Sequence, residues 1–340
     1  MARGRSFSKN SKKLRLDEPK NIWVKKSIDL VMDPDSRYLD RIFEVYPVHP
    51  EKREIPDLKM HERIIAKLLK AARKSGTKVD NSKIALISYL IFNFEKFPVD
   101  YPYVSFLRRL KSYGRYELVV QYLKKNPTVT SKIFELVDSL DFEGIIAGIT
   151  EPKKANRLFG VSKSNIITFL YNALKDDHKD NQNITIELVD TSDELLNKKY
   201  PGVYILKGSD KSLLEFAKTQ LGYHRENEKG LDLVLKIVTL SKKVVYLIGE
   251  AKFFTDSGGH QGRQRDDAFL LLNSEFTPKD PDSKVIPVAI LDGAIWIENK
   301  QKGHLQVRDL PPNKVALSFL VLKDFVNCIL MEDGSCVGLF

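Results

Sequence analysis

Apolar residues recur at intervals of three and four along residues 57–178, which is the spacing of one face of an α-helix. Gly, Pro, Asp and Asn separate these amphipathic stretches and mark the turns between them. The pattern predicts a mainly helical N-terminal region, with its clearest helices over 58–76, 82–97, 114–126 and 131–140.

The pattern changes after a polar, charged linker at 175–183. Beyond it, short apolar runs rich in β-branched and aromatic residues predict strands, and amphipathic stretches predict helices. The predicted strands are 184–190, 202–208, 231–240, 244–254 and 285–298, and the predicted helices are 210–222 and 317–330. Strands mixed with helices indicate an α/β or α+β fold.

The sequence therefore divides into three parts. Residues 1–20 form a polar arm that we expect to be flexible, with basic residues at Arg3, Arg5, Lys9, Lys12 and Lys13. Residues 21–180 form the mainly helical region, and residues 181–340 form the α/β domain. A chain of 340 residues is long enough for two domains that each bury a core.

The net charge of +10 favours polyanionic partners. A surplus of this sign raises the local concentration of nucleic acid and speeds its encounter with the protein. A lysine-rich solvated surface would give the same number, so charge alone does not decide between the two interpretations.

Other features bear on location. No apolar run approaches the ~18 residues of a membrane span, and the basic N-terminus lacks the apolar core of a secretory signal. The two cysteines, Cys328 and Cys336, form neither a disulfide framework nor a zinc-binding spacing. This usage fits a reducing cytoplasm.

The strands 231–240 and 244–254 are joined by a short polar turn, which predicts an antiparallel hairpin. A turn centred on Ser241 pairs Val238 with Val244. Continued along both strands, this register predicts which side chains lie opposite each other at the far end of the hairpin.

At that end the register places Asp232 opposite Glu250, with Cβ atoms roughly 4.5–5.5 Å apart. Lys252 shares the face because side chains alternate along a strand. Two carboxylates between apolar strands repel each other and are poorly solvated, and a divalent cation would resolve this conflict. Oxygen ligands at an open site suit Mg²⁺. Lys252 would then activate water or stabilise charge on a phosphate, which implies phosphodiester hydrolysis. The alternative is a half-exposed hairpin with a cross-strand charge pair.

These residues also form a known pattern. Asp232, 17 further residues and then Glu250-Ala251-Lys252 resemble the PD-(D/E)XK nuclease motif. The stretch GEAKFFTDSGGHQGRQ is similar to the catalytic stretch of type II restriction endonucleases, and VIPVAILDGAIW is similar to the strand that follows it. The resemblance covers residues 205–298. One position departs from the motif, because Leu231 stands where the proline is usual.

The resemblance implies a mixed β-sheet core flanked by helices, and Mg²⁺-dependent cleavage of double-stranded DNA. Carried over by position, Asp232 and Glu250 would bind the metal, and Lys252 would be the catalytic lysine. It also implies a homodimer, a prokaryotic cytoplasmic location and a companion DNA methyltransferase in the same system.

The residues after Gly258 and Gly259 are candidates for DNA contact: Gln261, Arg263, Gln264 and Arg265. Arg pairs with guanine and Gln with adenine in the major groove, but Arg equally contacts phosphate without reading sequence. Asp266 and Asp267 follow directly, so part of this run is alternatively a charged helix start. His260 is either a polar loop residue or a general base.

Residues 156–174 have the spacing of a helix-turn-helix, with Gly160 at the turn. Ser164 and Asn165 would begin the second helix, where base-reading residues lie in that motif. The alternative is an ordinary helical hairpin in which Gly is the C-cap.

Three further carboxylates lie near the predicted site in sequence. Glu215 falls about 200° around its helix from the apolar Leu213, which favours a solvated position. Glu226 and Glu228 precede the strand of Asp232 and are alternative metal ligands.

A type II restriction endonuclease is the leading hypothesis. Its helical region would assist DNA binding or dimerisation. One alternative is a repair or junction nuclease of the same fold that recognises DNA structure. The other is a non-catalytic DNA-binding regulator that uses residues 156–174. The chain contains no P-loop and no G-x-S-x-G elbow, which removes two other enzyme classes.

Overall fold

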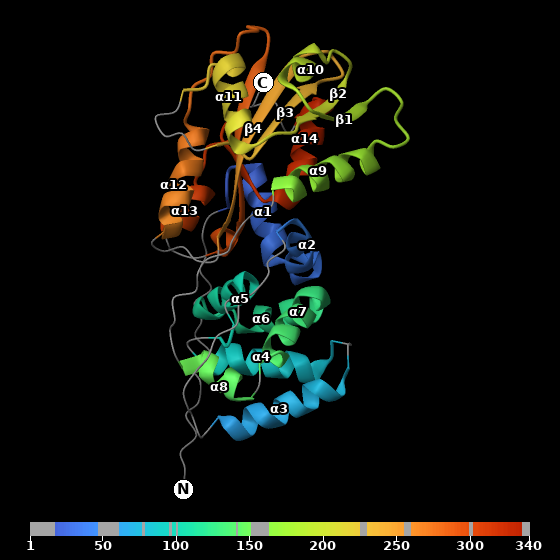
Figure 1. Ribbon diagram of the computed structural model, residues 1–340. Coiled ribbons are helices and arrows are strands. Elements are labelled where there is room, and N and C mark those ends of the chain that lie inside the picture. Colours follow the sequence, from blue (N-terminus) through green and yellow to red (C-terminus); the bar gives the residue numbers. More distant parts are fainter. Residues whose placement is uncertain are drawn as a thin grey trace.

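A computed structural model gives the structure of the chain (Figure 1). It describes residues 18–46, 61–76, 79–94, 97–99, 101–140, 142–150, 163–224, 230–254, 260–298 and 302–334. No helix in this described part is long and apolar enough to cross a membrane.

The five predicted strands and one further strand form one mixed sheet, in the order β1-β2-β3-β4-β5-β6. Strands β2, β3 and β4 are antiparallel neighbours, whereas the pairs β1–β2, β4–β5 and β5–β6 are parallel. The strands are β1 (Thr185–Val189), β2 (Gly202–Leu206), β3 (Leu233–Val238), β4 (Val244–Phe254), β5 (Lys284–Gly293) and β6 (Val315–Leu317).

The strand predicted over 285–298 is shorter than expected. It ends at Gly293, whose φ of 84° turns the chain into the 3-10 helix η2 (Ala294–Trp296). An ideal Cβ at this position would lie 2.1 Å from the carbonyl oxygen of Phe254, so only glycine fits. The sequence pattern did not predict β6, which is three residues long and directly precedes a helix.

Helices cover both faces of this sheet (Figure 1). On one face, Tyr204, Val234 and Ile248 share a core with α11 (Asp210–Leu221). On the other face, Leu235 and Leu247 belong to the core that includes the remaining sheet-covering helices. Those with contacts to the sheet are α1 (Ile22–Met32), α9 (Lys163–Asp177) and α14 (Phe319–Leu330). Helix α12 (His260–Leu272) connects β4 to β5 and packs against both strands.

The remaining helices form a body at one end of the sheet (Figure 1). The four predicted helices of this region are confirmed within a few residues at each end. The elements are α2 (Tyr38–Val45), α3 (Glu62–Lys74), α4 (Asn81–Asn93), α5 (Pro102–Ser112), α6 (Tyr116–Lys125), α7 (Pro127–Asp138) and α8 (Phe142–Thr150). Two short helices, α10 (Ser192–Asn197) and α13 (Lys302–Arg308), and the 3-10 helix η1 (Pro34–Ser36) complete the described helical elements. The mixed fold of N-terminal helices and helix-flanked sheet is therefore confirmed.

The polar linker predicted at 175–183 begins too early. Helix α9 continues to Asp177, because the last polar residues occupy its exposed turn. Asp177 there accepts from Lys323 and from the side-chain amide of Asn327 on α14. The first three residues of the predicted linker therefore belong to the helix, whereas residues 178–183 form turns and loop as predicted.

The helical region and the α/β region share one continuous core. Helix α1 packs against β6 and α14, and the Asn21 amide before it donates to the carbonyls of Pro311 and Lys314. Helices from both sides of residue 180 cover the sheet. The predicted boundary there between a helical region and an α/β domain therefore stays a prediction about their functions.

A buried carboxylate at the end of β5 ties the helical body to the sheet. Asp292 has no solvent exposure and accepts hydrogen bonds from the hydroxyls of Tyr38 and Tyr46, which begin and follow α2. It also accepts from the Ser318 hydroxyl and the Phe319 amide at the start of α14. Burial raises the pKa of Asp292 to about 7. One side chain thus joins α2, β5 and α14.

This pKa predicts how stability depends on pH. The folded protein holds the Asp292 proton more tightly than the unfolded chain, whose carboxyl has the ordinary value of 3.8. The contribution of Asp292 to stability is therefore present below about pH 4 and is lost as the pH rises to about 7. We expect Asp292→Asn to remove this part of the pH dependence of the melting temperature. Parallel melting curves of both proteins between pH 4 and 8 would contradict the shift.

Candidate active site

The β3–β4 hairpin has the predicted register. Val238 pairs with Val244, and Leu233 pairs with Gly249, so paired residue numbers have the same sum along the hairpin. The turn between the strands includes Lys242 in the left-handed region, with a φ of 67°. This register determines which residues meet at the other end of the hairpin.

Asp232 lies directly before β3 and is held in place by two hydrogen bonds. Its amide donates to the Gly249 carbonyl over 2.9 Å. Its carboxylate oxygen Oδ2 accepts from the Ala251 amide over 2.8 Å. The Asp232 side chain is therefore bonded to the backbone of the strand that carries Glu250 and Lys252.

The three predicted catalytic residues converge at this point. The Lys252 Nζ atom lies 3.4 Å from Asp232 Oδ2 and 3.9 Å from Glu250 Oε2. The side chain of Glu250 is 1% exposed, whereas those of Asp232 and Lys252 are 19% and 24% exposed. Two acidic side chains and one ammonium group thus form a cluster that is buried on one side and open to solvent on the other.

The chemistry of the cluster fits a hard divalent cation. Carboxylate oxygens are the ligands that Mg²⁺ prefers, and Mg²⁺ usually takes one or two from the protein and keeps several waters. No group of three or more His, Cys, Asp or Glu residues suited to a metal occurs in the described part of the chain. The pair Asp232 and Glu250 matches the sparse ligand set of Mg²⁺ better than the closed cage of a structural zinc site.

The end of β4 that follows Lys252 packs against the helical body. The Phe253 ring centroid lies 5.7 Å from that of Tyr46 and also 5.7 Å from that of Tyr103 on α5. The pKa of Tyr46 is raised by burial first, then by the charge of Asp292, and Asp232 adds to the same shift. The helical body therefore adjoins the strand end that carries the cluster.

Comparison with known families identifies the chain. A family model described as the Tsp45I type II restriction enzyme matches residues 21–329. The chain belongs to this family. No curated protein and no solved structure matched the chain. Membership of this family makes the enzyme a site-specific deoxyribonuclease with DNA as its substrate.

Arg265 of the restriction enzyme lies on α12, and its side chain packs towards α13. Its side chain is 12% exposed and donates to Asp266 Oδ1 over 2.9 Å. Its guanidinium also closely adjoins Gly303 on α13, where an added Cβ would lie 3.0 Å from Nη1. DNA contact by Arg265 stays a prediction, and this packing covers most of its side chain.

The other predicted DNA-contacting side chains lie outside the described parts of the enzyme. Helix α12 begins at His260, but the side chains of Gln261, Arg263 and Gln264 are not among the described ones. The same holds for Ser164 and Asn165. Helix α9, which they help to begin, buries Ile166 and Leu170 and packs against β1 and α14.

The other carboxylates that the sequence places near the site are not seen to join the cluster in the described part of the chain. Glu215 is exposed on α11, as its position around the helix predicted. Glu226 and Glu228 lie outside the described residues. Asp292 was not singled out in the sequence, although a lone carboxylate in the apolar run 285–297 is a signal that could have identified it.

The hydrogen bond from the Ala251 amide to Asp232 predicts that two substitutions of Asp232 differ in their effect on stability. Asp232→Ala leaves the largely buried Ala251 amide without its acceptor, which costs about 1–3 kcal/mol of unfolding free energy. Asp232→Asn retains a side-chain oxygen that can accept this bond, so its free energy of unfolding should lie within about 1 kcal/mol of the wild-type value. Urea denaturation measures both values. Equal stability of the two variants would show that the hydrogen bond does not hold the strand end.

Proposed function

We propose that this restriction enzyme cuts DNA at the cluster of Asp232, Glu250 and Lys252, with Mg²⁺ as its cofactor. The proposal is supported above all by the convergence of both carboxylates on the Lys252 ammonium, with Asp232 Oδ2 at 3.4 Å and Glu250 Oε2 at 3.9 Å, at a partly open strand end. The arrangement agrees with the PD-(D/E)XK motif, and we infer that the enzyme belongs to that nuclease superfamily.

Asp232 and Glu250 would hold the metal. When bound, Mg²⁺ supplies positive charge that polarises the scissile phosphate and makes water a better nucleophile at neutral pH. Because Asp232 is fixed by the Ala251 amide and Glu250 is buried, both carboxylates are held in position before substrate arrives. Little reorganisation is then needed when the phosphate binds.

Lys252 would act on the reacting atoms directly. Its side chain is more exposed than that of Glu250, so its ammonium can donate to an oxygen of the phosphate or orient the attacking water. The oxygen of water gives up a proton to solvent and forms a bond to phosphorus, one phosphorus–oxygen ester bond breaks, and the leaving oxygen takes up a proton from solvent. Lys252 stabilises the charge that develops on the phosphate during this exchange.

The helical region would position the DNA. We propose that residues 21–180 assist DNA binding or dimerisation, and that residues 181–340 form the catalytic domain. The basic arm of residues 1–20 would contact phosphates or a groove. Gln261, Arg263, Gln264, Arg265, Ser164 and Asn165 stay candidates for DNA contact.

The biological setting follows from the same proposal. A homodimer would bring two clusters to the two strands, and its two-fold symmetry would match a palindromic or near-palindromic site. A companion methyltransferase would protect the host DNA at that site. Both proteins would act in the prokaryotic cytoplasm.

The helix-turn-helix regulator is less favoured. The described part of α9 contributes buried side chains to the core beside β1 and α14, which is typical of a structural helix. The family also consists of enzymes that cut DNA, and family membership does not favour cleavage by DNA structure.

Cleavage of unmethylated phage DNA in Mg²⁺ tests the site. We expect discrete fragments from the wild-type enzyme and at least 100-fold slower cleavage by Lys252→Ala, because the variant loses the charge that stabilises the transition state. Lys243→Ala is the matched control, since it removes a lysine one residue before the opposite end of β4. Equal cutting by wild type and Lys252→Ala would place the active site elsewhere.

Metal dependence tests the role of the carboxylates. Chelation with EDTA should abolish cleavage, and added Mg²⁺ should restore it. Calorimetric titration should show weaker Mg²⁺ binding for Glu250→Gln than for wild type, because the variant lacks one charged ligand. Unchanged Mg²⁺ affinity in both Glu250→Gln and Asp232→Asn would exclude these residues as ligands.

A further inference from the structure

Helix α3 lies at the end of the helical body away from the sheet (Figure 1). Basic side chains form a row along it. The α3 basic row consists of Arg63, Lys67, Lys70 and Lys74, which are all exposed. With 3.6 residues per turn, these positions fall within an arc of about 60°. With a rise of 1.5 Å per residue, they span about 16 Å.

The packing of α3 fixes the direction of this row. Ile65, Leu69 and Ala72 are buried on the opposite side, and α3 packs against α4. The helix cannot rotate the basic row inward without exposing these apolar residues. The row is therefore held on the outer surface of the helical body.

Carboxylates do not neutralise this row within the part of the chain that the structure describes. The neighbouring Arg73 is different, because it pairs with Asp138 on α7. Like charges three and four residues apart on a helix destabilise it. A bound polyanion would remove this repulsion, so the row has the charge complementarity of a nucleic-acid surface.

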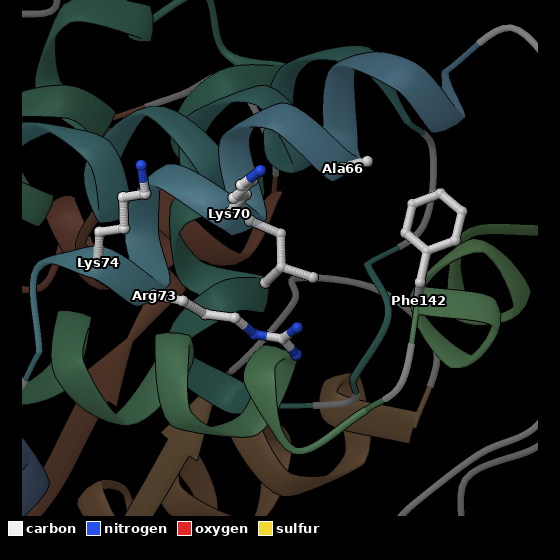
Figure 2. Close-up of a pocket in the computed structure, with 6 residues that line it drawn as sticks. Ala66, Lys70, Arg73, Lys74 and Phe142 are labelled. Carbon is white, nitrogen blue, oxygen red and sulfur yellow. The ribbon is translucent and has the colours of Figure 1, made fainter.

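A hollow of about 500 Å³ adjoins the row. In Figure 2 the ammonium groups of Lys70 and Lys74 extend in the same direction from α3, and the Phe142 ring of α8 lies farther along the hollow. Its other lining residues are Ala66, Leu69 and Arg73. Apolar walls with a cationic edge suit a sugar–phosphate chain better than a small neutral ligand.

We propose that the α3 basic row binds the phosphate backbone of DNA that flanks the recognition site. The row spans roughly five phosphates of one strand, which repeat every ~3.4 Å along the duplex axis. Lysine ammonium groups contact phosphates as point charges and do not read bases. Because α3 lies across the helical body from the Lys252 cluster, the contacted DNA lies outside the cut site. This inference rests on the proposed function.

The test is the salt dependence of DNA binding in EDTA, with a duplex that has long flanks and a duplex with the minimal site. Lys67→Gln/Lys70→Gln should lower the slope of log Kd against log salt by about 1.8 on long DNA, at ~0.9 for each lost phosphate contact. The ratio of the variant Kd to the wild-type Kd should therefore fall about 12-fold between 50 and 200 mM salt. On the minimal duplex the variant should match wild type.

Lys279→Gln/Lys284→Gln is the control. It removes the same charge from two exposed positions, one in the connection before β5 and one at the first residue of β5, which is the sheet end opposite the catalytic cluster. Slopes equal to that of this control would overturn the proposal, as would an equal loss on both duplexes. Cleavage rates distinguish the proposed function from the proposed role of α3. Absence of cutting by the wild-type enzyme contradicts the proposed function. Normal cutting by the variant with an unaltered salt slope contradicts only the role of α3.

Discussion

The register of the β3–β4 hairpin is the constraint on which the proposed site depends. The paired ladder ends at Leu233 and Gly249, and two hydrogen bonds hold Asp232 directly beyond it: its amide donates to the Gly249 carbonyl, and its carboxylate accepts from the Ala251 amide. A shift by one residue would move Glu250 and Lys252 to the other face of the sheet and separate them from Asp232. The apolar residues that surround the hairpin enforce the same register, because they too would change faces. Core packing and the position of the catalytic cluster therefore have one common cause.

The helical body is connected to this hairpin through its neighbour β5. Phe253 pairs with Asp292, and Asp292 accepts hydrogen bonds from Tyr38 and Tyr46 around α2. Tyr46 in turn packs against the Phe253 ring. These side chains link the region proposed to bind DNA with the strand proposed to cut it. Because this link is buried and hydrogen-bonded, the position of the helical body relative to the cluster is defined by specific contacts.

Much of this could be predicted from the sequence. The hairpin register followed from two apolar strands and a short turn, and it brought Asp232, Glu250 and Lys252 together, as the structure bears out. The link through Asp292 could not be predicted, because it depends on tyrosines more than 240 residues away in the chain. The end of β5 was missed because the apolar run continues through Gly293 into η2, and periodicity alone does not reveal a glycine turn. The packing of Arg265 against α13 likewise depends on tertiary contacts.

The most direct measurement is the anomalous diffraction of Mn²⁺ bound to crystals of the enzyme with its DNA, since Mn²⁺ accepts the same oxygen ligands as Mg²⁺. We expect an anomalous peak between the carboxylates of Asp232 and Glu250, with Lys252 beside the scissile phosphate. A peak at another group of side chains, with DNA seated there, would contradict the assignment of the active site.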